Sequence, residues 1–167
     1  MPECRDTVTG FFQDDHRRLD DVFERYEQAK AGASDDPGSV APIVDGSGRR
    51  VSGDPLVQFE AFAGGLRQHI VWEEEHLFPL FEQRTGMTLG GPTEVMRREH
   101  RQIERLLDDI AEGLRDGVLD DLGESEEVLT DMLAQHNVKE EQVLYPNIDN
   151  LLSDDDCAEL FGRIRRG

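Results

Sequence analysis

The sequence lacks the features that mark a membrane protein or a disulfide-bonded protein. Its two cysteines, Cys4 and Cys157, have neither metal-type nor redox-type spacing, which is typical of reduced thiols. No stretch approaches the length of about 18 apolar residues that a membrane span needs. The first residues do not combine a basic segment with an apolar run, so we expect no signal peptide. These absences predict a cytoplasmic location.

Basic residues are also scarce. The 167 residues contain 37 acidic and 18 basic side chains, which gives a formal net charge of −19 at pH 7. The phosphates of nucleic acids and of anionic lipids are bound by basic surfaces. We therefore expect no nucleic-acid partner and no membrane partner. The length favours a single domain over residues 1–167 that buries a substantial core.

Helical periodicity is abundant. Apolar residues recur at every third or fourth position in four segments, at about 6–31, 55–83, 93–117 and 125–152. Asp54 is a favourable N-cap for the second segment, and Pro55 a favourable first residue. Ser153 is expected to cap a short tail helix over about 153–166. The short second and third connections predict an all-α, antiparallel up-down four-helix bundle over about 6–152, with this helix at its end.

The first connection, at 32–54, is unusually long and is rich in Gly, Ser, Asp and Pro. A loop of this length within a compact domain is typically functional or disordered. The stretch IVDGSGRRV within it could also fold as a small hairpin. Its role stays open.

The second and fourth segments each carry a late proline, Pro79 and Pro146, which we expect to kink the helix. The inward face of the second segment is expected to hold Phe59, Phe62, Leu66, His69, Glu73, Leu77 and Leu80. The inward face of the fourth is expected to hold Leu129, Met132, Leu133, His136, Glu140 and Val143.

Four of the five histidines are followed by an acidic residue four positions later. Residues at i and i+4 lie on the same face of a helix, and each of these histidines falls on an apolar face. Buried carboxylates are costly without a positive partner, and the inward faces contain no Lys or Arg. Histidine with carboxylate, without thiolate, suits Fe, Mn or Zn. The pattern therefore predicts a metal site in the core, where His16, His69, His100 and His136 converge with carboxylates beside them. For Asp20, four residues after His16, a solvated position at the edge of the bundle is favoured over ligation.

The same motif occurs twice. HIVWEEEHLFP at 69–79 matches HNVKEEQVLYP at 136–146, and DDHRRLDD around His16 is similar to REHRQIER around His100. The first and third helices are therefore alike, as are the second and fourth. Two helical hairpins related by an approximate two-fold axis suit a pair of metal ions.

With these four motifs in this order, the sequence resembles the hemerythrin-like family, also called the HHE cation-binding domain, over about 6–152. The resemblance implies two iron ions, with Mn or Zn as substitutes. His16 and His69 would bind one ion, and His100 and His136 the other. Glu73 and Glu140 would bridge the two ions, together with an oxo, hydroxo or water oxygen.

Glu104 marks a departure from the family's oxygen carriers, which have a histidine at its position. It is a further candidate ligand, or it accepts a hydrogen bond from an imidazole. The carriers also have an Asp five residues after the last histidine. Here Glu140 is favoured over Glu141, because helical rotation places it about 40° from His136 rather than about 140°. A set of four histidines and two glutamates is nearer to the iron-centre repair and iron-sensing members.

The acids next to these ligands have two interpretations. Asp15 and Glu99, each directly before a histidine, could orient an imidazole, but exposed positions are favoured for both. Glu74 and Glu141 have the same two interpretations. His76 is about 10 Å along the helix from His69, which favours packing beside the site over ligation.

Several uses of such a site stay open at the level of sequence. One is binding or sensing of O2, NO or iron without catalysis. The alternative is a di-iron enzyme that acts in iron-centre repair, iron donation or peroxide removal. The sequence does not decide whether the protein is an enzyme, although a binding role is favoured.

Overall fold

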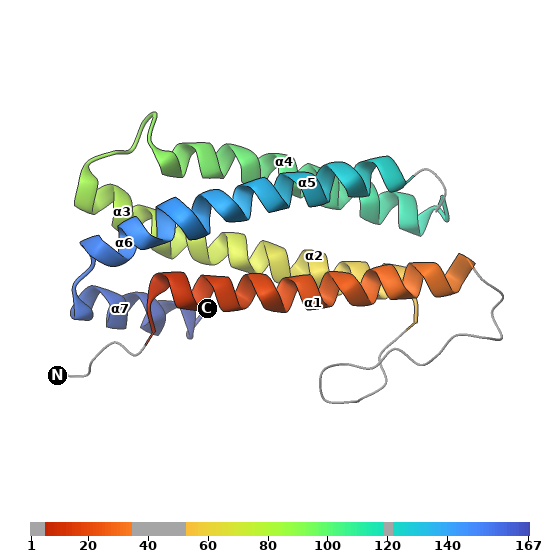
Figure 1. The fold of residues 1–167 in the computed structure, drawn as a ribbon, viewed down its shortest axis with the longest axis horizontal. Coiled ribbons are helices and arrows are strands. Elements are labelled where there is room, and N and C mark those ends of the chain that lie inside the picture. Colours follow the sequence, from red (N-terminus) through yellow and green to blue (C-terminus); the bar gives the residue numbers. More distant parts are fainter. Residues whose placement is uncertain (1–5, 35–52, 119–121) are drawn as a thin grey trace.

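The computed structural model describes residues 6–34, 53–118 and 122–167, and every regular element within these ranges is a helix. Figure 1 shows long helical rods that lie side by side along the longest axis of the molecule. The predicted all-α helical bundle is therefore confirmed. In the described part of the chain, no helix combines the length and the apolar character needed to cross a membrane.

Two pairs of long helices form the bundle. Helix α1 (Val8–Ser34) packs along α2 (Pro55–Trp72), and α4 (Pro92–Arg115) packs along α5 (Gly123–Lys139). Helix α2 also contacts α4, which joins the two pairs. Gly65 of α2 permits close approach to α1, because a Cβ atom there would lie 2.9 Å from Cδ2 of Leu19.

The four long helical segments, called rods here, begin with α1, α2, α4 and α5 in chain order. The second and fourth rods each contain a π-helical turn. Helix α2 continues through η1 (Glu73–Leu77) into α3 (Phe78–Thr85), and α5 continues through η2 (Glu140–Leu144) into α6 (Tyr145–Leu151). The chain then ends with α7 (Asp154–Ile164). Figure 1 shows α7 below α6, near the N-terminal end of α1, where Phe161 of α7 packs against Phe11.

The predicted helix starts are confirmed at two places. The side chain of Asp54 accepts a hydrogen bond from the backbone N–H of Leu56 at 2.9 Å, with Pro55 as the first residue of α2. Ser153 caps α7 in a reciprocal capping box with Asp156.

Helix ends differ slightly from the predictions. Helix α1 begins at Val8 and continues to Ser34, three residues beyond the predicted segment. The second rod ends at Thr85, where Gly86 adopts a left-handed conformation (φ 72°) and stops the helix. Most of the predicted connection at 32–54, including the hairpin, lies outside the described residues.

The prolines explain the π turns. Pro79 and Pro146 have no backbone N–H, so each interrupts the i to i−4 hydrogen-bond ladder of its helix. The N–H of Phe78 instead donates to the carbonyl of Glu73, and the N–H of Tyr145 donates to that of Glu140, each five residues earlier. Such turns insert one residue into a helix and are frequent at functional sites.

The π turns also correct the predicted inward faces. Val143 was expected to face inward but is 57% exposed, whereas Leu144 and Ile148 are buried. Leu80 is likewise only partly buried, and Phe81 takes its place in the core. The expected faces assumed unbroken α-helical periodicity, whereas the inserted residue rotates the later part of each rod relative to the earlier part.

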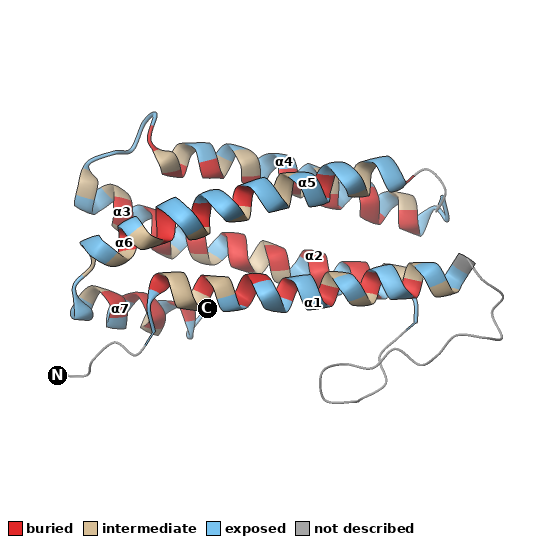
Figure 2. Ribbon diagram, in the orientation of Figure 1, coloured by how far each residue is buried: buried red, intermediate tan, exposed pale blue. Residues whose placement is uncertain are grey.

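The core consists of two apolar clusters separated by a polar layer. One cluster includes Tyr26, Phe59 and Leu107, and the other includes Phe12 and Phe78. Along each rod, the buried histidines and glutamates fall between residues of the first cluster and residues of the second. Figure 2 shows that the buried faces of the rods are directed toward each other. A buried layer of ionisable groups therefore crosses the centre of an apolar interior.

Candidate metal centre

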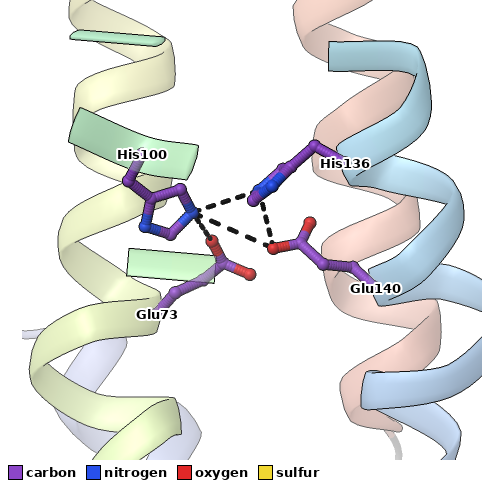
Figure 3. A group of neighbouring side chains, drawn as sticks. All are labelled: Glu73, His100, His136 and Glu140. Carbon is purple, nitrogen blue, oxygen red and sulfur yellow. Dashed lines mark hydrogen bonds and ion pairs between the residues drawn. The ribbon is translucent and has the colours of Figure 1, made fainter. Parts of the chain in front are cut away.

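Six of the seven predicted metal ligands come together in this polar layer. Their donor atoms form two groups, one from His16, His69 and Glu140, and one from Glu73, His100, His136 and Glu140. Within each group the atoms lie within 4.8 Å of one another, and every residue is buried. Figure 3 shows the second group, with side chains from two sides of the bundle directed toward one centre.

The imidazoles are arranged as two close pairs. The Nε2 atoms of His16 and His69 are 3.1 Å apart, and those of His100 and His136 are also 3.1 Å apart. No histidine of the four is more than 4% exposed. Each pair therefore directs two nitrogen donors toward one point in the core.

The two glutamates lie between the imidazole pairs, and both are completely buried. Oε2 of Glu140 is 3.4 Å from Nε2 of His16, and its Oε1 is 2.9 Å from Nε2 of His136. Oε2 of Glu73 is 3.2 Å from Nε2 of His100 and 3.7 Å from Nε2 of His69. Each carboxylate thus reaches both pairs, as a bridging ligand must.

A second carboxylate holds the outer nitrogen of each imidazole. Nδ1 of His69 pairs with Asp15 at 2.8 Å, and Nδ1 of His16 pairs with Glu141 at 2.7 Å. The other two pairs, each at 2.8 Å, are His100 with Glu74 and His136 with Glu99. A carboxylate on one ring nitrogen fixes the ring's orientation and leaves the other nitrogen directed at the centre. The favoured exposure of Asp15 and Glu99 is therefore wrong, because both pair with an imidazole, Asp15 is buried and Glu99 is partly buried. Orientation of an imidazole is the interpretation that fits all four acids.

Three of these four outer carboxylates also contact a cation. Arg18 donates to Asp15 at 2.7 Å, Arg101 lies 3.8 Å from Glu74, and Lys139 contacts Glu99. Glu141 instead accepts a hydrogen bond from the amide of Gln13 at 3.4 Å. The inward faces of the helices carry no positive side chain, but Arg18, Arg101 and Lys139 surround the centre on the far side of the outer carboxylates.

Without a metal ion, protons balance the buried glutamates. Burial alone lowers the pKa of His16, but the hydrogen bond and charge of Glu140 outweigh it and raise that pKa to about 9. Burial likewise opposes protonation of His100, and the adjacent carboxylates of Glu73 and Glu74 raise its pKa to about 10. Burial raises the pKa of Glu140, but the imidazolium of His136 dominates and holds it well below its ordinary value. These histidines thus carry the positive charge that a cation could replace.

Two buried carboxylate oxygens, Glu73 Oε2 and Glu140 Oε1, lack a hydrogen-bond partner among the described residues, although imidazole nitrogens are near. An unsatisfied buried polar atom is costly and calls for an explanation, such as a missing ion. Nitrogen and carboxylate donors in this arrangement fit a divalent metal ion such as iron.

Sequence reasoning missed one residue of the centre, Tyr145. Its ring is fully buried, and its hydroxyl lies 2.6 Å from Oε1 of Glu73 and 2.9 Å from Oε2 of Glu140. A comparison of the two repeats could have found it, because LYP in the second repeat stands against LFP in the first.

The remaining candidates lie apart from the two groups. Glu104 is partly exposed and contributes no atom to either group, so its role as a ligand stays a prediction. Asp20 is exposed on α1. His76 lines a surface cavity of about 360 Å³ together with Arg84 and Arg163.

Helical bundles that direct buried His and carboxylate side chains into the core form a class of metal-binding proteins, and the fold and site of this chain are of that class. Residues 7–148 match the family described as Hemerythrin HHE cation binding domain. This match covers most of the chain, and the chain therefore belongs to that family.

Two curated relatives match parts of the chain, and both are named iron-sulfur cluster repair protein YtfE. The protein from Dickeya chrysanthemi (strain Ech1591) is 30% identical over 102 residues, which are 60% of this chain and 41% of the relative. The one from Edwardsiella ictaluri (strain 93-146) is 43% identical over 51 residues, 30% of this chain and 23% of the relative. The matches thus span less than half of either relative's length. No solved structure matches this sequence.

Proposed function

We propose that this protein holds two iron ions in a carboxylate-bridged centre in the middle of a single-domain, antiparallel up-down four-helix bundle. His16 and His69 hold one ion, His100 and His136 hold the other, and Glu73 and Glu140 bridge them with a solvent-derived oxygen. The observation that carries this proposal is the convergence of these six buried side chains in two groups that share Glu140. The colour order of the rods in Figure 1 supports the alternating direction of the helices.

The surroundings of the centre support a role in holding reactive iron. Iron supplies redox chemistry and coordination places for small ligands. The outer carboxylates orient the imidazoles, while apolar rings exclude water. Phe78 stacks on His100 with ring centroids 5.8 Å apart, and Phe12 meets His69 edge-on at 5.2 Å.

A ferrous-iron titration without oxygen tests the two positions separately. The wild-type chain is expected to bind two irons, measured by a colorimetric iron assay after gel filtration. The double variant His100→Ala/His136→Ala is expected to bind one iron, because its other position keeps both histidines. The same stoichiometry in both proteins would contradict the assignment of ligands.

For the biological use of the iron, we propose repair of iron–sulfur centres, through donation of iron to a damaged cluster protein. The observation that favours this use is the name that the two relatives carry. The set of four histidines and two glutamates supports it further. This use makes an iron–sulfur protein the partner and is consistent with a cytoplasmic location.

Binding or sensing of O2 or NO is the second candidate use, favoured by the apolar rings packed against the imidazoles. The iron-loaded protein can be mixed with an iron–sulfur enzyme that has lost part of its cluster. Recovery of that enzyme's activity together with loss of iron from this protein supports repair. A reversible change in the visible spectrum on exposure to O2 or NO, without iron transfer, supports gas binding instead.

A further inference from the structure

The two halves of the centre correspond residue by residue, with one exception. The repeats pair His16 with His100, His69 with His136 and Glu73 with Glu140. They also pair Phe78 with Tyr145, and both of these side chains are fully buried. The rings occupy equivalent places, since Phe78 stacks on His100 at 5.8 Å and Tyr145 lies 6.0 Å from His16. The hydroxyl of Tyr145 therefore has no counterpart in the other half.

This hydroxyl lies on the side of His16 and His69. It is 3.5 Å from Nε2 of His69 and 2.9 Å from Oε2 of Glu140, and this same oxygen lies 3.4 Å from Nε2 of His16. It is also 2.6 Å from Oε1 of Glu73. A phenol has one proton to donate. The hydroxyl of Tyr145 can therefore donate to only one of Glu73 and Glu140 at a time, while its oxygen stays close to the other carboxylate.

On the opposite side of the centre, the equivalent ring is that of Phe78, which has no hydroxyl. The carboxylate oxygens on this side are Oε2 of Glu73, 3.2 Å from Nε2 of His100, and Oε1 of Glu140, 2.9 Å from Nε2 of His136, and both are buried. Four residues direct donor atoms to that side, compared with three on the side of His16 and His69.

We propose that Tyr145 makes the two metal positions unequal. The position of His100 and His136 takes the first divalent ion. At the position of His16 and His69, the hydroxyl of Tyr145 competes with the second ion for the oxygens of Glu73 and Glu140. A hydrogen bond to a charged group corresponds to an affinity difference of about 10-fold or more. This inference rests on the proposed metal-binding function.

The test is a calorimetric titration of the metal-free protein with Co²⁺, which avoids redox changes. The wild-type chain is expected to bind two ions in separate steps. Tyr145→Phe is expected to tighten the second step about 10-fold, because it removes the hydroxyl and keeps the ring. The mirror variant, Phe78→Tyr, places a hydroxyl at the equivalent position of the other half. It is expected to weaken the first step and bring the two constants together.

A crystal grown with one equivalent of Mn²⁺ locates the first ion by anomalous scattering, expected at His100 and His136 in the wild-type protein. Circular dichroism of each metal-free variant checks that the fold is kept. If the wild-type and Tyr145→Phe proteins both bind two ions, and the second binding constant is the same in both proteins, the inference is overturned and the proposed function stays intact. A weaker second step in Tyr145→Phe would also overturn it, because the hydroxyl would then support the ion. No binding to the wild-type protein would instead refute the proposed function.

Discussion

At the scale of single residues, the centre is built from pairs in which one side chain positions another. Each imidazole gives Nε2 to the centre and Nδ1 to an outer carboxylate. For example, Asp15 holds His69 and Glu99 holds His136. The outer carboxylate and its imidazole come from different rods, so packing of the rods and orientation of the ligands are coupled.

Replacement of an outer carboxylate is expected to weaken metal binding without unfolding the protein. Glu99→Gln keeps the size of the side chain but removes the charge that faces Nδ1 of His136. Loss of such a partner typically lowers metal affinity by about 10- to 100-fold. Competition with a chelator of known affinity measures the change. Glu75→Gln, at an exposed position of η1, is the matched control and is expected to leave the affinity unchanged. Equal affinities for both variants would contradict the role of Glu99.

The pKa values of the histidines predict how stability and metal binding depend on pH. The pKa of His16 rises from 6.5 to about 9 and that of His100 to about 10 in the folded, metal-free protein. Because the folded pKa is raised, this stabilisation is complete below about pH 6.5 and is lost as pH rises through 9 to 10. Metal ions must displace these protons, so the apparent metal affinity is expected to rise over the same range.

Urea unfolding of the metal-free protein and metal titrations at several pH values between 6 and 10 measure these two trends. Opposite trends are expected for the two quantities. A metal affinity that is constant over this range would contradict the protonated, metal-free state of the centre.

At the scale of the helices, the two π turns change which residues face the core, and the sequence pattern predicts these faces only in part. Local signals found the helix starts at Asp54 and Ser153, because caps and prolines act over a few residues. The i, i+4 pattern likewise placed the histidines inward. It could not predict the exposure of Val143, because an unbroken α-helical period does not include an inserted residue. Nor could it bring Tyr145 to the centre, which needs the inserted turn.

Deletion of Val143 tests the role of the second π turn. This residue is 57% exposed, so its loss removes little core packing. Without the extra residue, the turn is expected to become α-helical and to change the orientation of Glu140 relative to Tyr145. Helix content by circular dichroism should be retained, while metal affinity falls at least about 10-fold, as for other losses of ligand orientation.

Val143→Ala keeps the length of the chain and is the control for this deletion. A surface substitution of this kind typically changes stability by less than about 0.5 kcal/mol. Metal affinity of the control should match that of the wild-type protein. A deletion variant that binds metal as tightly as the control would show that the π turn is not needed.

At the scale of the whole molecule, the centre joins all four rods across an otherwise apolar core. The outer carboxylates on α1, α4, η1 and η2 are each bound to an imidazole from another rod. In the metal-free state, protons on the histidines balance the buried charges of Glu73 and Glu140. In the loaded state, two cations would balance them. Metal binding should therefore stabilise the bundle as a unit.

Loading with metal is expected to raise the melting temperature. A ligand at about 1,000 times its dissociation constant contributes about 4 kcal/mol of stability. For a domain of this size, 1 kcal/mol corresponds to a shift of about 2–4 °C, so a rise of roughly 8–16 °C is expected. Differential scanning calorimetry of loaded and chelator-treated protein measures it, and the double variant His100→Ala/His136→Ala should show a smaller rise. Identical melting temperatures would mean that the ion does not bind the folded centre.

The most direct test of the account is the metal content of the protein after expression in iron-containing medium. Elemental analysis of the purified chain, with the protein concentration from amino-acid analysis, gives metal atoms per chain. The account predicts two irons per chain, with absorption bands of an oxygen-bridged ferric pair in the near-ultraviolet and visible spectrum. A folded protein that contains no iron and takes up none on anaerobic loading would contradict it.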